Sequence, residues 1–500
     1  MTAQPAAVPS DDTTQRDALH TEPATDGASQ RDSRVLWLLL VATFVVILNE
    51  TIMSVAITDI MRDFHVDARA GQWLTTAFML TLAVVIPITG ILLQRFSTRA
   101  MFIAAMTLFS TGTLIAATAP VFGVLLAARV VQASGTAIMM PLLMTTIMTV
   151  VAPAKRGRTM GNVSIVISVA PAIGPTIAGV ILSALAWRWI FWFVLPIAVA
   201  MLLVGAWRVR NVSATGQVPI DVLSVVLSVF GFGGVVYGLS RIGATDQAAS
   251  GGAMPMIAAF VFGGLALIAF VLRQLFLQKR DRALLDLRTF GSSIFSVAIV
   301  LMAVSMAALL GTVILLPIFM QQVLGLDPLY IGLLLLPGGL IMGLLAPLVG
   351  RLYDRFGTRP LLVPGAVLMS AALWMLALVG AHTSPWYLLA AHIVLSVGLA
   401  FLFTPLFTAG LGAVPERFYS HGSAIIGTIQ QVAGAAGTAL FVAVMSVRST
   451  PLTSTGASMT DATASGIGLA FLVGAAISLG AVVAAFFVRT PATAGDAVAL

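Results

Sequence analysis

One acidic residue, Glu50, lies well inside a long apolar segment of the chain. A charged side chain at the centre of a bilayer costs at least ~2.5–3.5 kcal/mol, so such an acid is expected to face a cavity or a partner. Because apolar surroundings favour the neutral form of a carboxyl group, proton exchange at this position can move toward physiological pH. Glu50 would then attract a cation when ionised and release it when protonated. The alternative is a structural glutamate held by capping or hydrogen-bonding neighbours.

Arg129 is the one basic residue predicted within an apolar segment. At about 1.5 Å per residue, Arg129 lies about 12 Å and Glu50 about 10–11 Å from the same predicted membrane face. We therefore predict that the two residues communicate and that Arg129 helps to set the proton affinity of Glu50. Alternatively, Arg129 binds backbone carbonyls and stabilises two spans. Asn49 and Gln132 are assigned to the same site for proton coupling and substrate through the family resemblance described below.

Other polar residues within the predicted spans could line a cavity or could hydrogen-bond neighbouring helices. They are Gln132, Asn162, Gln321, Gln322, Gln430 and Gln431. His392 is a further possible cavity residue that could titrate near neutral pH, and the alternative is a packing role. Gly174, Pro175 and Gly179 predict a pliable hinge, because proline removes a backbone donor and glycine removes side-chain bulk; a passive kink is the alternative. No nucleophile–base pair and no metal-ligand cluster is recognisable, and cysteine is absent. No catalytic residue, no metal site and no enzymatic activity is therefore predicted.

The composition is that of a membrane protein. Hydrophobic residues make up 59% and charged residues 9% of the chain, and the mean hydropathy is +1.04. Soluble domains have roughly 25% charged residues. A membrane helix needs about 20 apolar residues. This rule predicts fourteen spans, near residues 35–57, 73–93, 100–118, 121–150, 161–185, 189–207, 220–240, 254–277, 292–322, 330–350, 361–380, 386–411, 422–447 and 465–488.

The basic residues provide an independent test of this topology. With fourteen spans, 20 of the 26 Lys and Arg residues fall on one side, five on the other, and Arg129 within a span. Cytoplasmic loops carry such an excess. Both termini are therefore predicted to lie in the cytoplasm, with the chain in the inner (cytoplasmic) membrane. Residues 1–34 are predicted to form a disordered cytoplasmic tail and residues 491–500 a second cytoplasmic tail.

A short basic motif occurs twice, 260 positions apart, at residues 90–99 and 350–359. Its recurrence predicts two related six-helix bundles, residues 35–210 and 291–490. Residues 211–290 would then supply two inserted helices and a cytoplasmic linker. Both copies are predicted to anchor the topology and to act as gating loops, through Gly90, Arg95, Arg99, Gly350, Asp354, Arg355, Gly357 and Arg359. The first copy has Gln94 where the second has Asp354, so the two halves should differ energetically.

The chain resembles the major facilitator superfamily, in particular its fourteen-span drug:proton antiporter-2 branch. Residues 350–359 match the loop signature G-x-L-x-D-R-x-G-x-R. Residues 129–135 are similar to R-x-x-Q-G-x-G, residues 174–179 to the antiporter signature G-P-x-x-G-G, and residues 48–52 to L-D-x-T-I with Asn49 in place of the acid. The resemblance covers about residues 35–490 and implies an all-α polytopic fold.

This resemblance implies alternating-access export of lipophilic, often cationic drugs or toxic compounds in exchange for protons. The proton-motive force would be the energy source, with no cofactor; the partners would be the substrate, protons and the bilayer. An ATP-driven pump is disfavoured, because neither Lys155 nor Lys279 lies in a phosphate-binding loop. Nucleic acid is not a predicted partner, and a monomer is compatible with the sequence, which does not indicate the oligomeric state. Specialised export of a lipid, metabolite or antibiotic, proton-coupled nutrient import and a non-transporting receptor are the alternatives.

Overall fold

The computed structural model describes residues 26–212, 216, 219–242, 254–454 and 458–488. These residues form fourteen helices that are long and apolar enough to cross a membrane, which confirms the predicted all-helical fold with fourteen spans. The helices are α1 (Asp26–Phe64), α2 (Ala68–Arg95), α3 (Thr98–Ala117), α4 (Phe122–Val150), α5 (Arg156–Ala184), α6 (Arg188–Arg208), α7 (Val222–Ile242), α8 (Met254–Leu277), α9 (Ser293–Gln322), α10 (Pro328–Phe356), α11 (Arg359–Ala377), α12 (Pro385–Gly412), α13 (Tyr419–Ser454) and α14 (Met459–Ala485).

Helix α1 is longer than the predicted span at both ends. It begins at Asp26, so residues 26–34 of the predicted disordered tail are helical. Residues 1–25 of that tail and the predicted C-terminal tail, 491–500, lie outside the described residues. The far end of α1 continues past residue 57, and there Arg62 forms an ion pair with Asp59 one turn earlier, at 3.6 Å. Polar pairs of this kind stabilise helical turns that no apolar stretch predicts.

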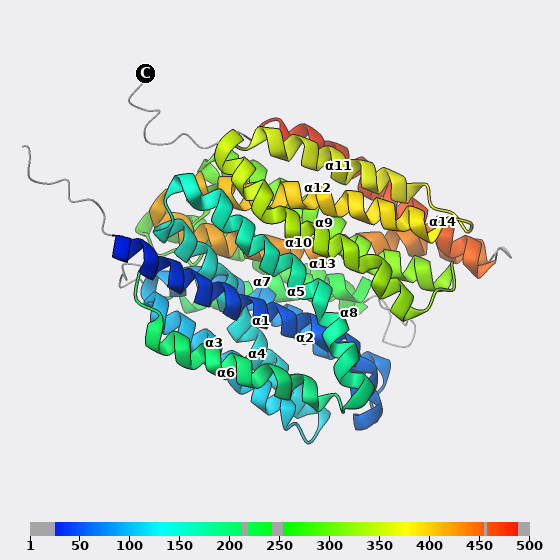
Figure 1. The fold of residues 1–500 in the computed structure, drawn as a ribbon, viewed down its shortest axis with the longest axis horizontal. Coiled ribbons are helices and arrows are strands. Elements are labelled where there is room, and N and C mark those ends of the chain that lie inside the picture. The colour runs from blue at the N-terminus through cyan, green and yellow to red at the C-terminus, as the bar shows by residue number, and fades with distance from the viewer. Residues whose placement is uncertain (1–25, 213–215, 217–218, 243–253, 455–457, 489–500) are drawn as a thin grey trace, which may run out of the picture.

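The helices form two groups, α1–α6 and α9–α14, which lie side by side with their axes roughly aligned (Figure 1). Two helix pairs form the main contacts between the groups, α5 with α10 and α2 with α13. Small residues permit close approach along both. A Cβ atom on Gly161 of α5 would lie 2.6 Å from the carbonyl oxygen of Ala346, and one on Gly427 of α13 would lie 3.0 Å from Ile86. Membrane helices associate largely through such close packing.

The inserted helices α7 and α8 form a hairpin beside one of these seams. They cross where a Cβ atom on Gly234 would lie 2.8 Å from the Cα atom of Gly263. Helix α7 contacts α2 of the first group and α13 of the second, and Tyr237 stacks on Trp73 of α2 with ring centroids 5.9 Å apart. The inserted pair therefore covers the α2–α13 seam and touches both groups.

A polar cluster fixes the hairpin to the linker that follows it. Asp221 accepts two hydrogen bonds from the Arg273 guanidinium, at 2.6 and 2.7 Å, and one from the backbone N–H of Ser224, at 2.8 Å. Gln274 donates to the Ser224 hydroxyl and accepts from the backbone N–H of Leu284. Asp221 thus caps α7 and joins it to α8, so the two helices and the linker are held as one unit.

We expect Asp221→Asn to lower the melting temperature at neutral pH, because Arg273 would lose its charged partner. The Arg273 hydrogen bonds, followed by those of Ser224, hold the pKa of Asp221 well below its usual value. A depressed folded-state pKa contributes stability above ~pH 4 that is lost as pH falls through the folded pKa. The variant should therefore lose ~1–3 kcal/mol at pH 7, and the difference should shrink below ~pH 4. Melting curves at pH 7 and pH 3.5, with exposed Asp59→Asn as the control, test this expectation; an equal loss at both pH values would contradict it.

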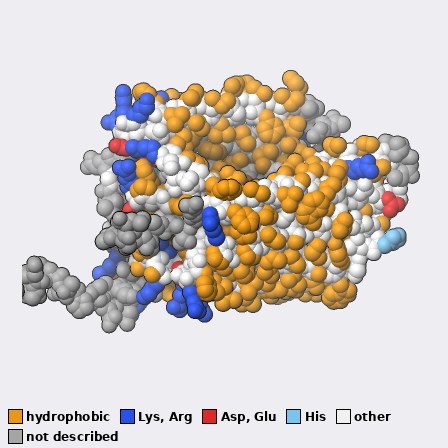
Figure 2. Space-filling model, turned by 90° about the horizontal axis from the view of Figure 1, so that it is seen from above, with side chains coloured by type: hydrophobic (Ala, Val, Ile, Leu, Met, Phe, Trp, Pro, Cys, Tyr) orange, Lys and Arg blue, Asp and Glu red, His pale blue; other side chains and the backbone are white. Residues whose placement is uncertain are grey.

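Charge distinguishes the two ends of the molecule. Hydrophobic side chains cover the middle of the face in Figure 2, and Lys and Arg side chains gather mainly at its left end. We call this end the basic end. It carries the connections at residues 96–97, 151–155, 278–292, 357–358 and 413–418 and the described residues 209–212, 216 and 219–221.

Candidate functional site

A chain of buried hydrogen bonds surrounds Arg129 within the first group of helices. The guanidinium Nη1 donates to Oε1 of Gln132 at 2.5 Å. Gln132 Nε2 donates to the hydroxyl of Thr113 at 2.8 Å, and this hydroxyl donates to the carbonyl oxygen of Phe109 at 2.7 Å. Arg129 is 1% exposed and Gln132 is fully buried. The chain links α4 to α3 and fixes the position of the guanidinium.

Two further contacts connect Arg129 to α1 and α2. Nη1 lies 3.4 Å from Oδ1 of the buried Asn49, and the guanidinium carbon lies 4.1 Å from the centre of the Phe78 ring. A cation over an aromatic face is stabilised by ~0.5–2 kcal/mol, more where water is excluded. Among the described residues, Nε of Arg129 and Nδ2 of Asn49 have no acceptor. The cluster around Arg129 therefore joins four helices, and two of its buried donors, one on Arg129 and one on Asn49, are unused within the described structure.

Glu50 is half-buried beside this cluster, one residue after Asn49. Among the described residues, the ion pairs closer than 4.0 Å do not include one between Glu50 and Arg129. Glu50 and Arg129, which the sequence analysis grouped with Asn49 and Gln132, are thus neighbours of these two residues. In this conformation Arg129 donates to the side-chain amide oxygens of Asn49 and Gln132. Within the part of the chain that the structure describes, it binds neither the Glu50 carboxylate nor a backbone carbonyl.

Gly174 lets α5 pack closely against α1, the helix that carries Glu50. A Cβ atom there would collide with the hydroxyl of Thr51 on α1, so only glycine allows α5 to approach so closely. Pro175 is exposed, and Gly179 has no atom within 4 Å of a Cβ position. Helix α5 is continuous through both prolines, Pro171 and Pro175. Bending at this segment stays a prediction.

At the basic end, the second copy of the repeated motif seals the α5–α10 seam. The Asp354 carboxylate accepts from the backbone N–H of Gly157 and of Arg158, each at 2.8 Å. These donors belong to the first turn of α5, where unpaired N–H groups and the helix dipole favour an anion. Gly350 packs directly against the backbone of Gly157, where a Cβ atom would not fit.

The first copy of the motif makes a different contact at the α2–α13 seam. Gln94 Nε2 donates to the carbonyl oxygen of Arg417 at 3.2 Å, just before α13. Gly90 packs against Ala424 and the backbone of Ser420. The amide of Gln94 therefore makes a neutral hydrogen bond, whereas Asp354 binds a helix N-terminus with a full charge. The contacts at the two seams therefore differ, and an energetic difference between the two halves stays a prediction.

We expect Asp354→Asn to open the basic end of the α5–α10 seam. A charge-assisted hydrogen bond contributes ~1.5–3 kcal/mol, so the closed population should fall by roughly tenfold or more. The chain has no cysteine, so a single cysteine at Val169, which contacts Gly343 of α10, can report opening by its labelling rate. Asp327→Asn, at the other end of α10 and without a capping hydrogen bond, is the matched control. Unchanged labelling in Asp354→Asn would show that the hydrogen bonds of Asp354 do not keep this end of the α5–α10 seam closed.

The remaining predicted gating residues have local roles in the structure. Gly357 ends α10 with a φ of 77°, which favours glycine. The backbone N–H of Arg99 donates to Asn211 at 3.3 Å, and Arg95 and Arg355 lie over the following rings, Phe96 and Phe356. Arg359 is exposed at the start of α11.

The predicted cavity residues do not gather in one place. His392 packs against Gly338 within the second group, close to the backbone of Leu335. Gln430 contacts the sulfur of Met302 at 3.9 Å, and Gln431 is half-buried beside it on α13. Gln321 and Gln322 are exposed in the last turn of α9, at the end of the bundle opposite the basic end. They are therefore not part of the cluster around Arg129.

Two hydroxyl pairs across the seams were missed by the sequence reasoning. Thr145 pairs with Ser423 and Ser164 with Thr404, both at 2.8 Å. Single hydroxyls in apolar helices are too common to mark a partner 240 or more positions away. Both pairs lie in the half of the bundle nearer the basic end, where the groups are in contact.

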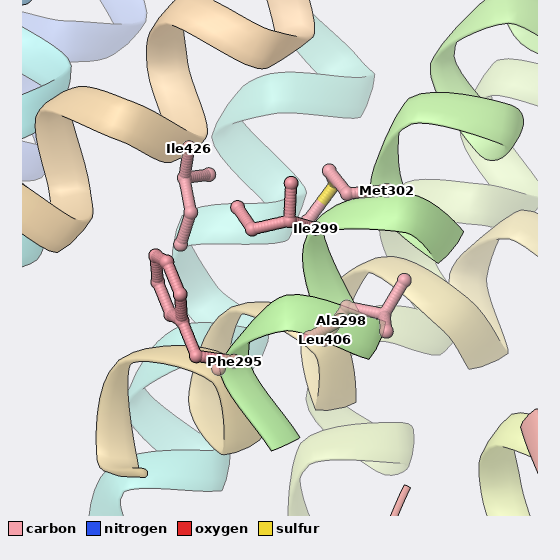
Figure 3. Close-up of a pocket in the computed structure, with 7 residues that line it drawn as sticks. Phe295, Ala298, Ile299, Met302, Leu406 and Ile426 are labelled. Carbon is pink, nitrogen blue, oxygen red and sulfur yellow. The ribbon is translucent and has the colours of Figure 1, made fainter. Parts of the chain in front are cut away.

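A narrow apolar crevice lies within the second group, between α9, α12 and α13 (Figure 3). Phe295, Ile299, Met302 and Ile426 point toward it, and its space is too narrow for a water molecule. It has no polar lining and lies away from Arg129. The crevice is a packing feature and does not belong to the candidate site.

Comparison with known proteins identifies relatives along nearly the whole chain. The sequence model of the Major Facilitator Superfamily matches residues 39–438. The MFS-type transporter YcnB of Bacillus subtilis is 40% identical over 460 residues, covering 92% of this chain and 95% of its own. The lincomycin resistance protein LmrB of Listeria monocytogenes is 39% identical over 425 residues, covering 85% and 89%. The human organic anion transporter MFSD10 shares the fold, with a TM-score of 0.65 at 13% identity, covering 91% and 99%.

Proposed function

Because the chain belongs to the Major Facilitator Superfamily and is a multi-pass membrane transporter, we propose that it exports lipophilic, often cationic drugs or toxic compounds in exchange for protons. The observation that carries this proposal is the position of Glu50. It is a half-buried acid within a span, next to a fixed guanidinium and to two buried donors for which the described residues supply no acceptor. A carboxyl group in this setting can gain and lose a proton as its surroundings change.

From the contacts between the two groups of helices we infer which side of the membrane the site faces in this structure. The basic end is closed by Asp354, Gly350 and Gly90, whereas Gly179 of α5 and Gly332 of α10, nearer the other end, have no neighbour within 4 Å of a Cβ position. We assign the basic end to the cytoplasm, because cytoplasmic loops carry the excess of Lys and Arg. Both termini then lie in the cytoplasm, and the structure corresponds to the state that exchanges with the outside.

Proton exchange at Glu50 would couple the two directions of movement. Facing outward, Glu50 takes up a proton, loses its attraction for a cationic substrate and releases it. Facing inward, it returns the proton to the cytoplasm and binds the next substrate. When neither substrate nor proton is bound, the unused donors of Arg129 and Asn49 can bind the ionised carboxylate. The empty ionised site is thereby stabilised without water.

The relatives suggest which compounds to test. One is named a lincomycin resistance protein, and a Mycobacterium tuberculosis relative, 30% identical over 411 residues, is named a multidrug resistance protein B homolog. We propose lincomycin and lipophilic cationic dyes as substrates of this chain. A protein that moves lincomycin but none of the dyes would be a specialised antibiotic exporter.

Transport into inside-out membrane vesicles tests this function directly. With the vesicle interior acidified, lincomycin or ethidium should accumulate inside, and a protonophore should abolish the accumulation. A vesicle lacking the protein provides the background. Accumulation that ignores the pH gradient would exclude proton coupling, and proton-driven movement in the opposite direction would identify an importer.

A further inference from the structure

A second pocket opens on the outer surface of the second helix group, away from Arg129 and both seams. It has a volume of about 420 Å³ and lies between α11, α13 and α14. Its lining residues are Ala377, Val379, Arg448, Ser465, Gly468, Leu469 and Leu472. We propose that this pocket binds an anionic phospholipid of the surrounding bilayer, with the headgroup phosphate at Arg448 and an acyl chain along the apolar wall.

The position of the pocket matches the headgroup level of a membrane. Helix α11 ends at Ala377, on the pocket wall, whereas the α13–α14 hairpin continues beyond it and projects at the right edge of Figure 1. Trp386, 67% exposed at the start of α12, lies at the same end of the bundle. Exposed Trp residues are enriched at the membrane–water interface.

The charge of the pocket selects an anion. Nε of the exposed Arg448 donates to the Ser465 hydroxyl at 3.2 Å, and no carboxylate of a described residue lies within 4.0 Å of Arg448. Arginine presents five donors in a planar fork that suits phosphate. A phosphate bound here would give the guanidinium the anionic partner that the protein itself does not supply.

The apolar part of the pocket lining, formed by Leu469 and Leu472 of α14, suits a hydrocarbon chain. Leu472 is 41% exposed, and Leu469, one turn closer to Ser465, is half-buried. Gly468, which has no side chain to fill the pocket, packs against the end of α11, where a Cβ atom would lie 3.3 Å from the carbonyl oxygen of Ala377. The pocket thus has a polar part for a headgroup and an apolar part for an acyl chain. Free phosphate would contact only the polar part at Arg448.

Lipid retention on the purified full-length protein, measured by native mass spectrometry, tests this proposal. Phosphatidylglycerol and phosphatidylcholine with the same acyl chains are added separately. The unsubstituted protein should retain phosphatidylglycerol roughly fivefold better, the effect of one basic residue at an anionic surface. Arg448→Gln should remove this preference, and Ser465→Leu, which fills the pocket but keeps the guanidinium, should reduce retention of both lipids.

Matched controls separate this site from general surface charge. Arg62→Gln removes another exposed arginine at the same end and should leave the preference unchanged. Melting temperatures in phosphatidylcholine should agree among all variants. A preference that survives Arg448→Gln, or an equal loss in Arg62→Gln, would overturn the proposal. Inorganic phosphate that displaces phosphatidylglycerol at equal concentration would do the same, because the acyl chain would then contribute nothing.

Discussion

Glu50→Gln is expected to abolish proton-driven accumulation while leaving passive equilibration of the substrate. Glutamine keeps the size of glutamate and one acceptor oxygen, but an NH2 group replaces the other oxygen and the side chain cannot be ionised. One pH unit corresponds to ~1.4 kcal/mol, so one exchanged proton can sustain about tenfold accumulation of a neutral substrate. In vesicles with a one-unit gradient, the unsubstituted protein should approach this ratio, and the variant should remain near one.

The control for Glu50→Gln lies on the same helix. Asp59→Asn removes an exposed carboxylate of α1 that is paired only with Arg62, and it should transport normally. Exchange of labelled for unlabelled substrate without a pH gradient should persist in Glu50→Gln at saturating substrate concentration, because it needs no net proton movement, although a cationic substrate should bind more weakly without the carboxylate charge. A Glu50→Gln protein that still concentrates substrate under the gradient would transfer the coupling role to another group.

Fourteen spans were predictable because the bilayer imposes a length and a composition on each helix. The ends of α1 were not, since its extra turns are polar and depend on side-chain pairs such as Arg62–Asp59. Placement of the inserted pair was likewise beyond the sequence. The glycines of α7, such as Gly234, indicate a close neighbour but do not say that the neighbour is α8 at Gly263.

Contacts within the candidate site were predictable only where the two residues are close together in the sequence. Arg129 and Gln132 are three residues apart on one helix face, so their contact follows from helical geometry. Asn49 was grouped with them through family resemblance. Phe78 carries no signal, because an aromatic residue in a membrane helix usually faces lipid or packing neighbours. Asp354 was predicted only as a residue of a gating loop, since no pattern in the sequence shows which helix N-terminus lies opposite that loop.

Arg129→Ala is expected to have two separable effects, one on stability and one on coupling. Removing the guanidinium leaves Gln132 Oε1 and Asn49 Oδ1 without their donor and frees the Phe78 ring. A buried polar group left without its hydrogen-bond partner costs ~1–3 kcal/mol, so the melting temperature should fall clearly. This loss alone is what a purely structural arginine would produce.

The coupling effect appears in the pH profile of transport. Because the positive charge of Arg129 favours the ionised form of Glu50, its removal should make Glu50 hold its proton at higher pH. The pH of half-maximal exchange should therefore move in the alkaline direction in Arg129→Ala. Phe78→Leu is the matched control: it removes the ring contact but leaves the charge, so it should lower stability by ~0.5–2 kcal/mol without moving the profile. If Arg129→Ala folds and its profile coincides with that of Phe78→Leu, Arg129 only fastens helices together, and the proton affinity of Glu50 is set by its apolar surroundings.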